Sequence, residues 1–174
     1  MVIGLSLWSS LHISGMESTV VVIEENISRD EIHQRCQEII HRFINQRHPI
    51  PPFGGDINRY NCIRVSISDV SLNRIRNLHL DASGGRQCTS NKSRLNEIFE
   101  NAHVHLDLND TQSMPTALLY RFYCVQTISF SNSNTFEPQH TVLGIGLGIT
   151  RKLAEQAASL VTLESLGFET LPIT

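Results

Sequence analysis

Hydrophobic positions recur along this chain in two spacings, which predict strands in some segments and helices in others. The β-branched run at residues 18–25, STVVVIEE, predicts a strand. Ser28 and Glu31 have the spacing of a capping box, so a helix is expected from Arg29 to about Gln46. One face of that helix is apolar and carries Ile32, Cys36, Ile39, Ile40, Phe43 and Ile44.

The middle of the chain suggests a division into two parts. Alternating apolar residues predict a half-buried strand at 61–68, whereas the segment 70–80 is ambiguous. The Gly/Ser-rich stretch at 81–91 is the best candidate for a linker. Because 174 residues fit one ordinary domain or two small ones, we expect an α+β region at 1–80 and a second domain at 92–174.

The second domain is predicted to contain a helix, three strands and a final helix. Helical spacing of apolar residues places the first helix at 92–102. The three strands are predicted at residues 103–108, 118–130 and 140–148, with a loop at 109–117. Thr150 is a suitable N-cap for the last helix, which is expected to end near Leu166.

Composition narrows the class of protein only slightly. Apolar residues make up 40% of the chain, and the formal net charge of −3 indicates neither a nucleic-acid nor a membrane partner. The four cysteines form no CxxC pair, which favours reduced thiols in an intracellular protein, cytoplasmic or nuclear. No apolar run approaches the roughly 20 residues that a membrane-spanning helix needs. We expect no cofactor.

The segment from Gly144 to Ala158, GIGLGITRKLAEQAA, has three glycines before a helix, which raises the question of a phosphate-binding loop. A P-loop requires lysine and a hydroxyl directly after the last glycine, and the order here is different. A Rossmann fingerprint requires a further strand beyond the helix, which we do not expect here. The run LESLGFETL has Phe168 where the ribonuclease III signature has a metal-binding aspartate, so we expect no nuclease activity at this position.

Three segments together resemble the double-stranded RNA-binding domain family. They are SRLNEIFENA at 93–102, YRFYCVQTISF at 120–130, and GLGITRKLAEQAASLVTLESLG at 146–167. The variant form found as the Dicer dimerisation domain is similar as well, since it has a comparable K-x-A-x-x-A-A run followed by Leu-Gly and Leu-Pro. The resemblance covers about residues 91–168. It implies an αβββα domain, with a three-stranded antiparallel sheet and two helices on one face.

The resemblance also implies a surface for duplex RNA. Thr150, Arg151 and Lys152 stand where the family has Ser-Lys-Lys at the start of its last helix, and Glu97 stands at its acidic position on the first helix. The departures are Glu155 in place of a third basic residue, Glu100 in place of an amide, and a first loop without Gly-Pro-x-His. We therefore expect weak duplex binding or none.

A second apolar stripe runs along the last helix, away from the positions that match the core of the family. It consists of Ile149, Leu153, Leu160 and Leu163. An apolar stripe at this place predicts a surface covered by protein. The cover is either the N-terminal half of the same chain or a separate partner, including a second copy of the chain.

Other groups of polar residues have simpler interpretations. His33, Cys36 and His41 lie on the first helix, where core packing is favoured over a metal site. His103 and His105 are expected to face solvent. The arginines before and within the linker form either a solvated face or a phosphate-binding surface: Arg59, Arg64, Arg74, Arg76 and Arg86. No catalytic grouping can be defended from the sequence.

The sequence thus favours a non-catalytic accessory protein of RNA processing or silencing, which acts through protein–protein contact or dimerisation of its last helix. The alternative is a sequence-independent binder of duplex RNA that uses the start of that helix. A weaker alternative is an accessory fragment of a ribonuclease III or Dicer-type nuclease.

Overall fold

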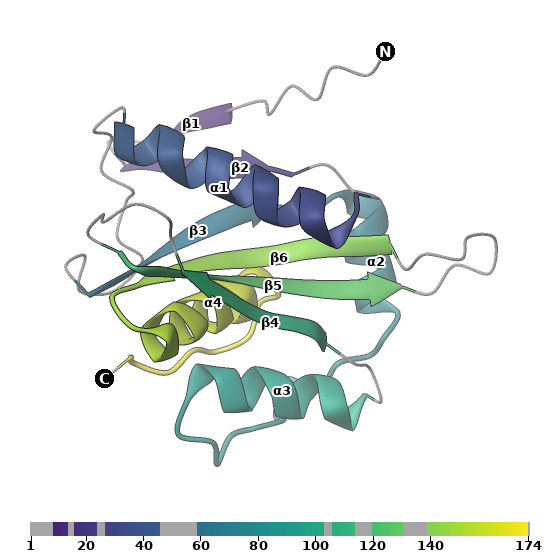
Figure 1. Cartoon of the computed structure of the whole chain (residues 1–174). Helices are drawn as coiled ribbons and strands as arrows, with labels where there is room; N and C mark the ends of the chain where they lie inside the picture. Colours follow the sequence, from purple (N-terminus) through teal and green to yellow (C-terminus); the bar gives the residue numbers. More distant parts are fainter. Residues whose placement is uncertain are drawn as a thin grey trace.

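A computed structural model describes residues 9–13, 16–23, 27–45, 59–102, 106–113, 120–130 and 139–173 (Figure 1). The strands within these residues are β1 (Ser9–Ile13), β2 (Met16–Val22), β3 (Tyr60–Ser66), β4 (Leu106–Ser113), β5 (Phe122–Phe130) and β6 (Gln139–Gly148). The helices are α1 (Arg29–Asn45), α2 (Asp69–Arg76), α3 (Asn91–Asn101) and α4 (Arg151–Ser165).

All six of these described strands belong to one mixed sheet with the order β1-β2-β3-β6-β5-β4. β2 and β3 are parallel and are connected through α1, whereas the other neighbouring pairs are antiparallel. A parallel pair needs such a crossover, because its second strand must start again from the same end of the sheet.

The prediction of an α+β protein is confirmed, but the separate three-stranded sheet is not. The strands β4, β5 and β6 are antiparallel neighbours, yet β6 also pairs with β3, with Ile63 opposite Ile145. Strands from residues 1–80 and from residues 92–174 therefore share one sheet. The edge backbone groups of β6 find their partners in β3, which removes one exposed sheet edge.

The segment predicted as a linker, residues 81–91, packs against α3. Gly84 and Gly85 are buried in it, and a side chain at Gly85 would meet the Arg94 backbone at 2.9 Å. Arg94 is itself buried and donates to the Ala82 carbonyl at 3.2 Å. This segment is thus held to the helix that it precedes.

Helices cover both faces of the sheet (Figure 1). α1 covers one face, where Ile32, Cys36 and Ile40 pack among the side chains of β3 and β6, such as Ile63 and Ile145. On the other face, α3 and α4 pack against each other and the sheet. This second face carries the candidate site.

The predicted bounds of the helices agree closely with the structure, because each start is set by a local cap. Ser28, Ser90 and Thr150 accept hydrogen bonds from backbone N–H groups three residues later. The ambiguous segment 70–80 contains α2, which begins after the N-cap Ser68. The prediction of a loop at 109–117 is wrong in its first part, since β4 continues to Ser113.

Some predictions lie outside the described residues. These are the solvent-facing positions of His103 and His105 and the core positions of the Phe43 and Ile44 side chains.

Candidate functional site

The glycines of β6 lie against α4 and allow it to approach the sheet closely. Gly144, Gly146 and Gly148 alternate along the strand, so all three face the helix. A Cβ at Gly146 would lie 2.1 Å from the Ala154 carbonyl oxygen and 2.3 Å from the Ala158 nitrogen. These glycines therefore serve helix–sheet packing, in agreement with a spacing that fits neither common nucleotide-binding loop.

Small side chains complete this close contact. Cys62 on β3 and Cys124 on β5 both pair with Gly146, one on each side, and both are buried. The Cys62 thiol donates to the Ala157 carbonyl of α4 at 3.3 Å. Burial, with a further contribution from the Glu164 carboxylate, raises the pKa of Cys62 to about 12. The thiol is therefore protonated at neutral pH and belongs to the packing.

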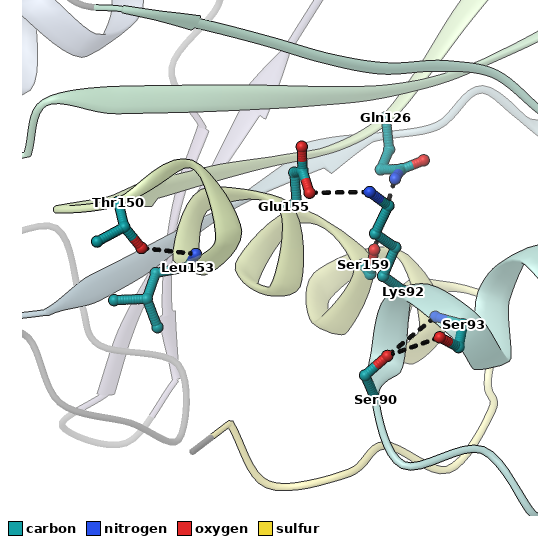
Figure 2. A network of polar contacts seen from close by, with 8 residues as sticks. All are labelled: Ser90, Lys92, Ser93, Gln126, Thr150, Leu153, Glu155 and Ser159. Carbon is teal, nitrogen blue, oxygen red and sulfur yellow. Dashed lines mark hydrogen bonds and ion pairs between the residues drawn. The ribbon is translucent and has the colours of Figure 1, made fainter.

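The start of α4 is exposed and positively charged. Thr150 is the N-cap, and its hydroxyl accepts from the Leu153 N–H at 3.2 Å (Figure 2). Arg151 and Lys152 are both exposed in the first turn, and the Arg151 guanidinium lies 5.1 Å from the centre of the Phe122 ring. Cations here oppose the helix dipole, so they contribute little to the stability of α4.

Two further arginines flank this helix start. The Ile149 N–H donates to the Arg59 carbonyl at 3.0 Å, and the Arg121 N–H donates to the Gly148 carbonyl at 3.1 Å. Arg59 precedes β3, Arg121 precedes β5, and both are exposed. Because β3 and β5 begin where β6 ends, the sheet brings these residues to the same end (Figure 1).

We call Arg59, Arg121, Arg151 and Lys152 the cationic corner. The sequence indicated Arg59 only as one of several scattered arginines, and it gave no reason to select Arg121 as a candidate. The register of β3, β5 and β6 identifies them, and no local motif in the sequence does.

Glu155, the acidic departure from the family pattern, is paired. Its carboxylate lies 2.8 Å from the Lys92 ammonium of α3, and both side chains are partly buried (Figure 2). This ion pair joins α3 to the second turn of α4. It also neutralises the one acidic residue of the first two turns, which favours anion binding at the helix start.

Glu97 is exposed on α3 and accepts a hydrogen bond from the Cys88 thiol at 2.9 Å. This bond and the carboxylate charge raise the pKa of Cys88. The structure thus places Glu97 beside the segment 81–91, and its contact there is with a thiol.

The apolar stripe of α4 is covered by the chain itself. Leu153 and Leu160 are each 6% exposed, and Leu163 is fully buried. Tyr60 and Cys62 of β3 pack on Leu153 and Leu160, whereas Leu163 packs with residues of α3. Ile149, at the end of the stripe, is half-buried.

For Leu153 and Leu160 this burial corresponds to the alternative in which the N-terminal half covers the stripe, whereas Leu163 is covered by α3. The three leucines belong to the core, and Ile173 of the same chain packs on the cluster that contains Leu153 and Leu160.

The remaining candidates have structural roles. His33 is buried, and its Nδ1 lies 3.0 Å from the hydroxyl of Tyr123 under α1. Arg64 forms an ion pair with Glu164 across β3 and α4. Within the described ranges, no group of three or more His, Cys, Asp or Glu side chains is placed to hold a metal ion. No helix in the same ranges has the length and hydropathy to cross a membrane.

Comparison with known proteins adds no relative. No protein-family model, curated protein or solved structure matches this chain.

Proposed function

We propose that this protein is a non-catalytic accessory protein that binds the phosphate backbone of duplex RNA through the cationic corner. The observation that carries the proposal is that exposed Arg59 and Arg121 are held by backbone hydrogen bonds to Ile149 and Gly148, next to the helix start that carries the exposed Arg151 and Lys152. A helix start with unpaired N–H groups and a positive dipole end favours anions. Exposed cations around it extend that preference over more than one phosphate.

The position of α4 also supports binding to a backbone. The glycines of β6 hold the helix directly on the sheet, with a closest approach at Gly146. Thr150 caps the first turn, so the backbone N–H groups have a defined direction. A rigid helix start costs less conformational entropy on binding than a loop does.

The alternative of protein contact through the leucine stripe has less support. Leu153 and Leu160 are almost fully buried, and a partner would need the chain to open before it could reach them. A role as part of a ribonuclease III or Dicer-type assembly is compatible with the corner, since an accessory domain of that kind also contacts RNA backbones.

The number of cations in the corner determines how strongly the expected RNA affinity depends on salt. If each of its four cations neutralises one phosphate, the logarithm of the binding constant falls by about 3.6 per tenfold rise in salt, at about 0.9 per phosphate. Between 50 and 200 mM salt the affinity then falls by about 150-fold. The same slope is expected for duplexes of different sequence, because phosphates carry no sequence information.

The test is a fluorescence-anisotropy titration of the full chain against a duplex of about 20 base pairs at several salt concentrations. Neutralising two cations with Arg151→Gln and Lys152→Gln is expected to halve the salt slope. A matched control is Arg74→Gln with Arg76→Gln, which removes the same charge from α2 at the other end of the sheet (Figure 1).

The control variant, Arg74→Gln with Arg76→Gln, is expected to keep most of the wild-type dependence of binding on salt. Absence of binding at micromolar protein in low salt would exclude the proposal. Equal loss of affinity in both double variants would also exclude the corner as the site, because net charge alone would then explain the binding.

A further inference from the structure

The segment that follows α4 folds back along the helix and docks on the α3/α4 face (Figure 1). Gly167 has φ +83° and ends α4, with the Phe168 N–H donating to the Leu163 carbonyl at 2.9 Å. This is a Schellman turn, which reverses the direction of the chain. Residues 168–173 then run beside α3 and α4 without entering the sheet.

Asn91, the first residue of α3, holds this segment by its backbone. Its side-chain amide donates to the Leu171 carbonyl at 2.8 Å, and its side-chain oxygen accepts from the Leu171 N–H at 2.7 Å. Asn91 is only 1% exposed. Two short bonds to the N–H and the C=O of one residue recognise an extended backbone whatever its side chain, as a neighbouring strand would.

Side chains on either side of this contact add an apolar preference. Leu171 and Ile173 are half-buried, whereas Pro172 between them is exposed. Ile173 packs against the cluster that contains Leu153 and Leu160. Proline lacks an N–H group, so at an outward position it loses no hydrogen bond. The observed occupant is thus an extended apolar-Pro-apolar segment.

We propose that Asn91, Leu153 and Leu160 form a peptide-binding groove, which residues 171–173 fill in cis and which accepts the same segment from a second copy of the chain. Asn91 binds the backbone N–H and C=O of one residue of the segment, and the leucines bind the apolar side chain two residues later. Gly167 is the hinge for exchange, because it is exposed, has a positive φ, and a side chain there would meet open space. This inference is independent of RNA binding.

The in-cis segment competes with any segment in trans at the high effective concentration that a short connection provides. The probe is a fluorescent peptide with the sequence GFETLPI of residues 167–173, titrated into the full chain. Wild type is expected to bind it weakly. Ile173→Asp should weaken docking in cis and leave the groove intact, so this variant is expected to bind the peptide at least about tenfold more tightly.

Two controls test the groove itself. Asn91→Asp keeps the acceptor for the Leu171 N–H, removes the donor to its carbonyl, and places a favourable acidic residue in the first turn of α3. When Asn91→Asp is combined with Ile173→Asp, we expect the peptide to bind no more tightly than it binds to wild type. A peptide with an N-methyl group on the leucine nitrogen tests the same contact without altering the protein. The N-methyl peptide should bind at least about fivefold more weakly, because the side-chain oxygen of Asn91 no longer accepts a hydrogen bond from the leucine N–H.

The proposal is overturned if Ile173→Asp binds the peptide no more tightly than wild type does. It is equally overturned if the N-methyl peptide binds as well as the unmodified one, because the Asn91 contact would then make no contribution.

Discussion

The substitution Gly146→Ala tests the closest contact in the fold. The new Cβ would lie 2.1 Å from the Ala154 carbonyl oxygen, whereas ordinary contacts begin near 3.4 Å. The separation must therefore grow by about 1.3 Å. The obstructing atoms belong to the α4 backbone, so no rotation of a side chain relieves the clash, and the helix must move away from the sheet.

The loss of stability depends on the packing contacts that are broken when α4 moves away from the sheet. α4 is held on this face by fully buried side chains, including Ala154, Ala158 and Val161. A gap of 0.5–1 Å already forfeits roughly a quarter to a half of each dispersion contact. Overpacking in cores costs about 1–3 kcal/mol and at times more. We expect about 3 kcal/mol for Gly146→Ala, which lowers Tm by about 6–12 °C for a chain of this size.

Two comparisons separate steric packing from general effects of replacing glycine. Gly167→Ala introduces a side chain at positive φ but into open space, so it should cost only about 1–2 kcal/mol. Gly144→Ala would meet the side chains of Val161 and Thr162 at 2.6 and 2.8 Å, and Val161→Ala should partly rescue it. Gly146→Ala should not be rescued by Ala154→Gly, because the clash involves backbone atoms.

The assay is urea unfolding followed by circular dichroism, with the free energy of unfolding compared across the five variants and wild type. If Gly146→Ala unfolds at the wild-type midpoint, or costs less than Gly167→Ala, the helix does not lie on the strand as described.

Two further predictions concern buried side chains. Leu160→Ala should lower the free energy of unfolding by about 2–5 kcal/mol, measured in urea, because this residue is 6% exposed. A dissociated but equally stable chain, detected by light scattering, would instead identify Leu160 as an interface residue. Burial raises the pKa of both Cys36 and Cys62 to about 12, from a usual value near 9. Their contribution to stability is therefore complete below pH 9 and is lost as pH rises from about 9 to 12, at about 1.4 kcal/mol per pH unit for each thiol. Cys36→Ala should reduce the pH dependence of the urea midpoint between pH 9 and 11, and an unchanged slope would contradict the assigned burial.

Local patterns in the sequence determined most of the elements. The capping residues Ser28 and Thr150 and the apolar spacing after them were sufficient to place α1 and α4. α3 was predicted to within one residue for the same reason. α2 was missed because its polar sequence, DVSLNRIR, buries only Ser71 and Ile75, so its apolar face is too narrow to recognise.

The candidate site could be predicted only in its local part. Thr150, Arg151 and Lys152 are adjacent in the sequence, so they were recognised together at a helix start. Arg59 and Arg121 join them only because β3 and β5 both pair with Gly148. Such pairing depends on contacts between residues far apart in the chain, and no local spacing encodes it.

The glycine-rich segment shows the same division most clearly. The sequence by itself determined that a strand ends at Gly148 and that a helix begins after Thr150, because both depend on neighbouring residues. Only the tertiary structure decided what the glycines and leucines do. Gly146 admits the backbone of α4, and Leu160 lies beneath Tyr60. The first depends on how α4 packs on β6, and the second on β3, a strand from the other half of the chain that lies next to β6.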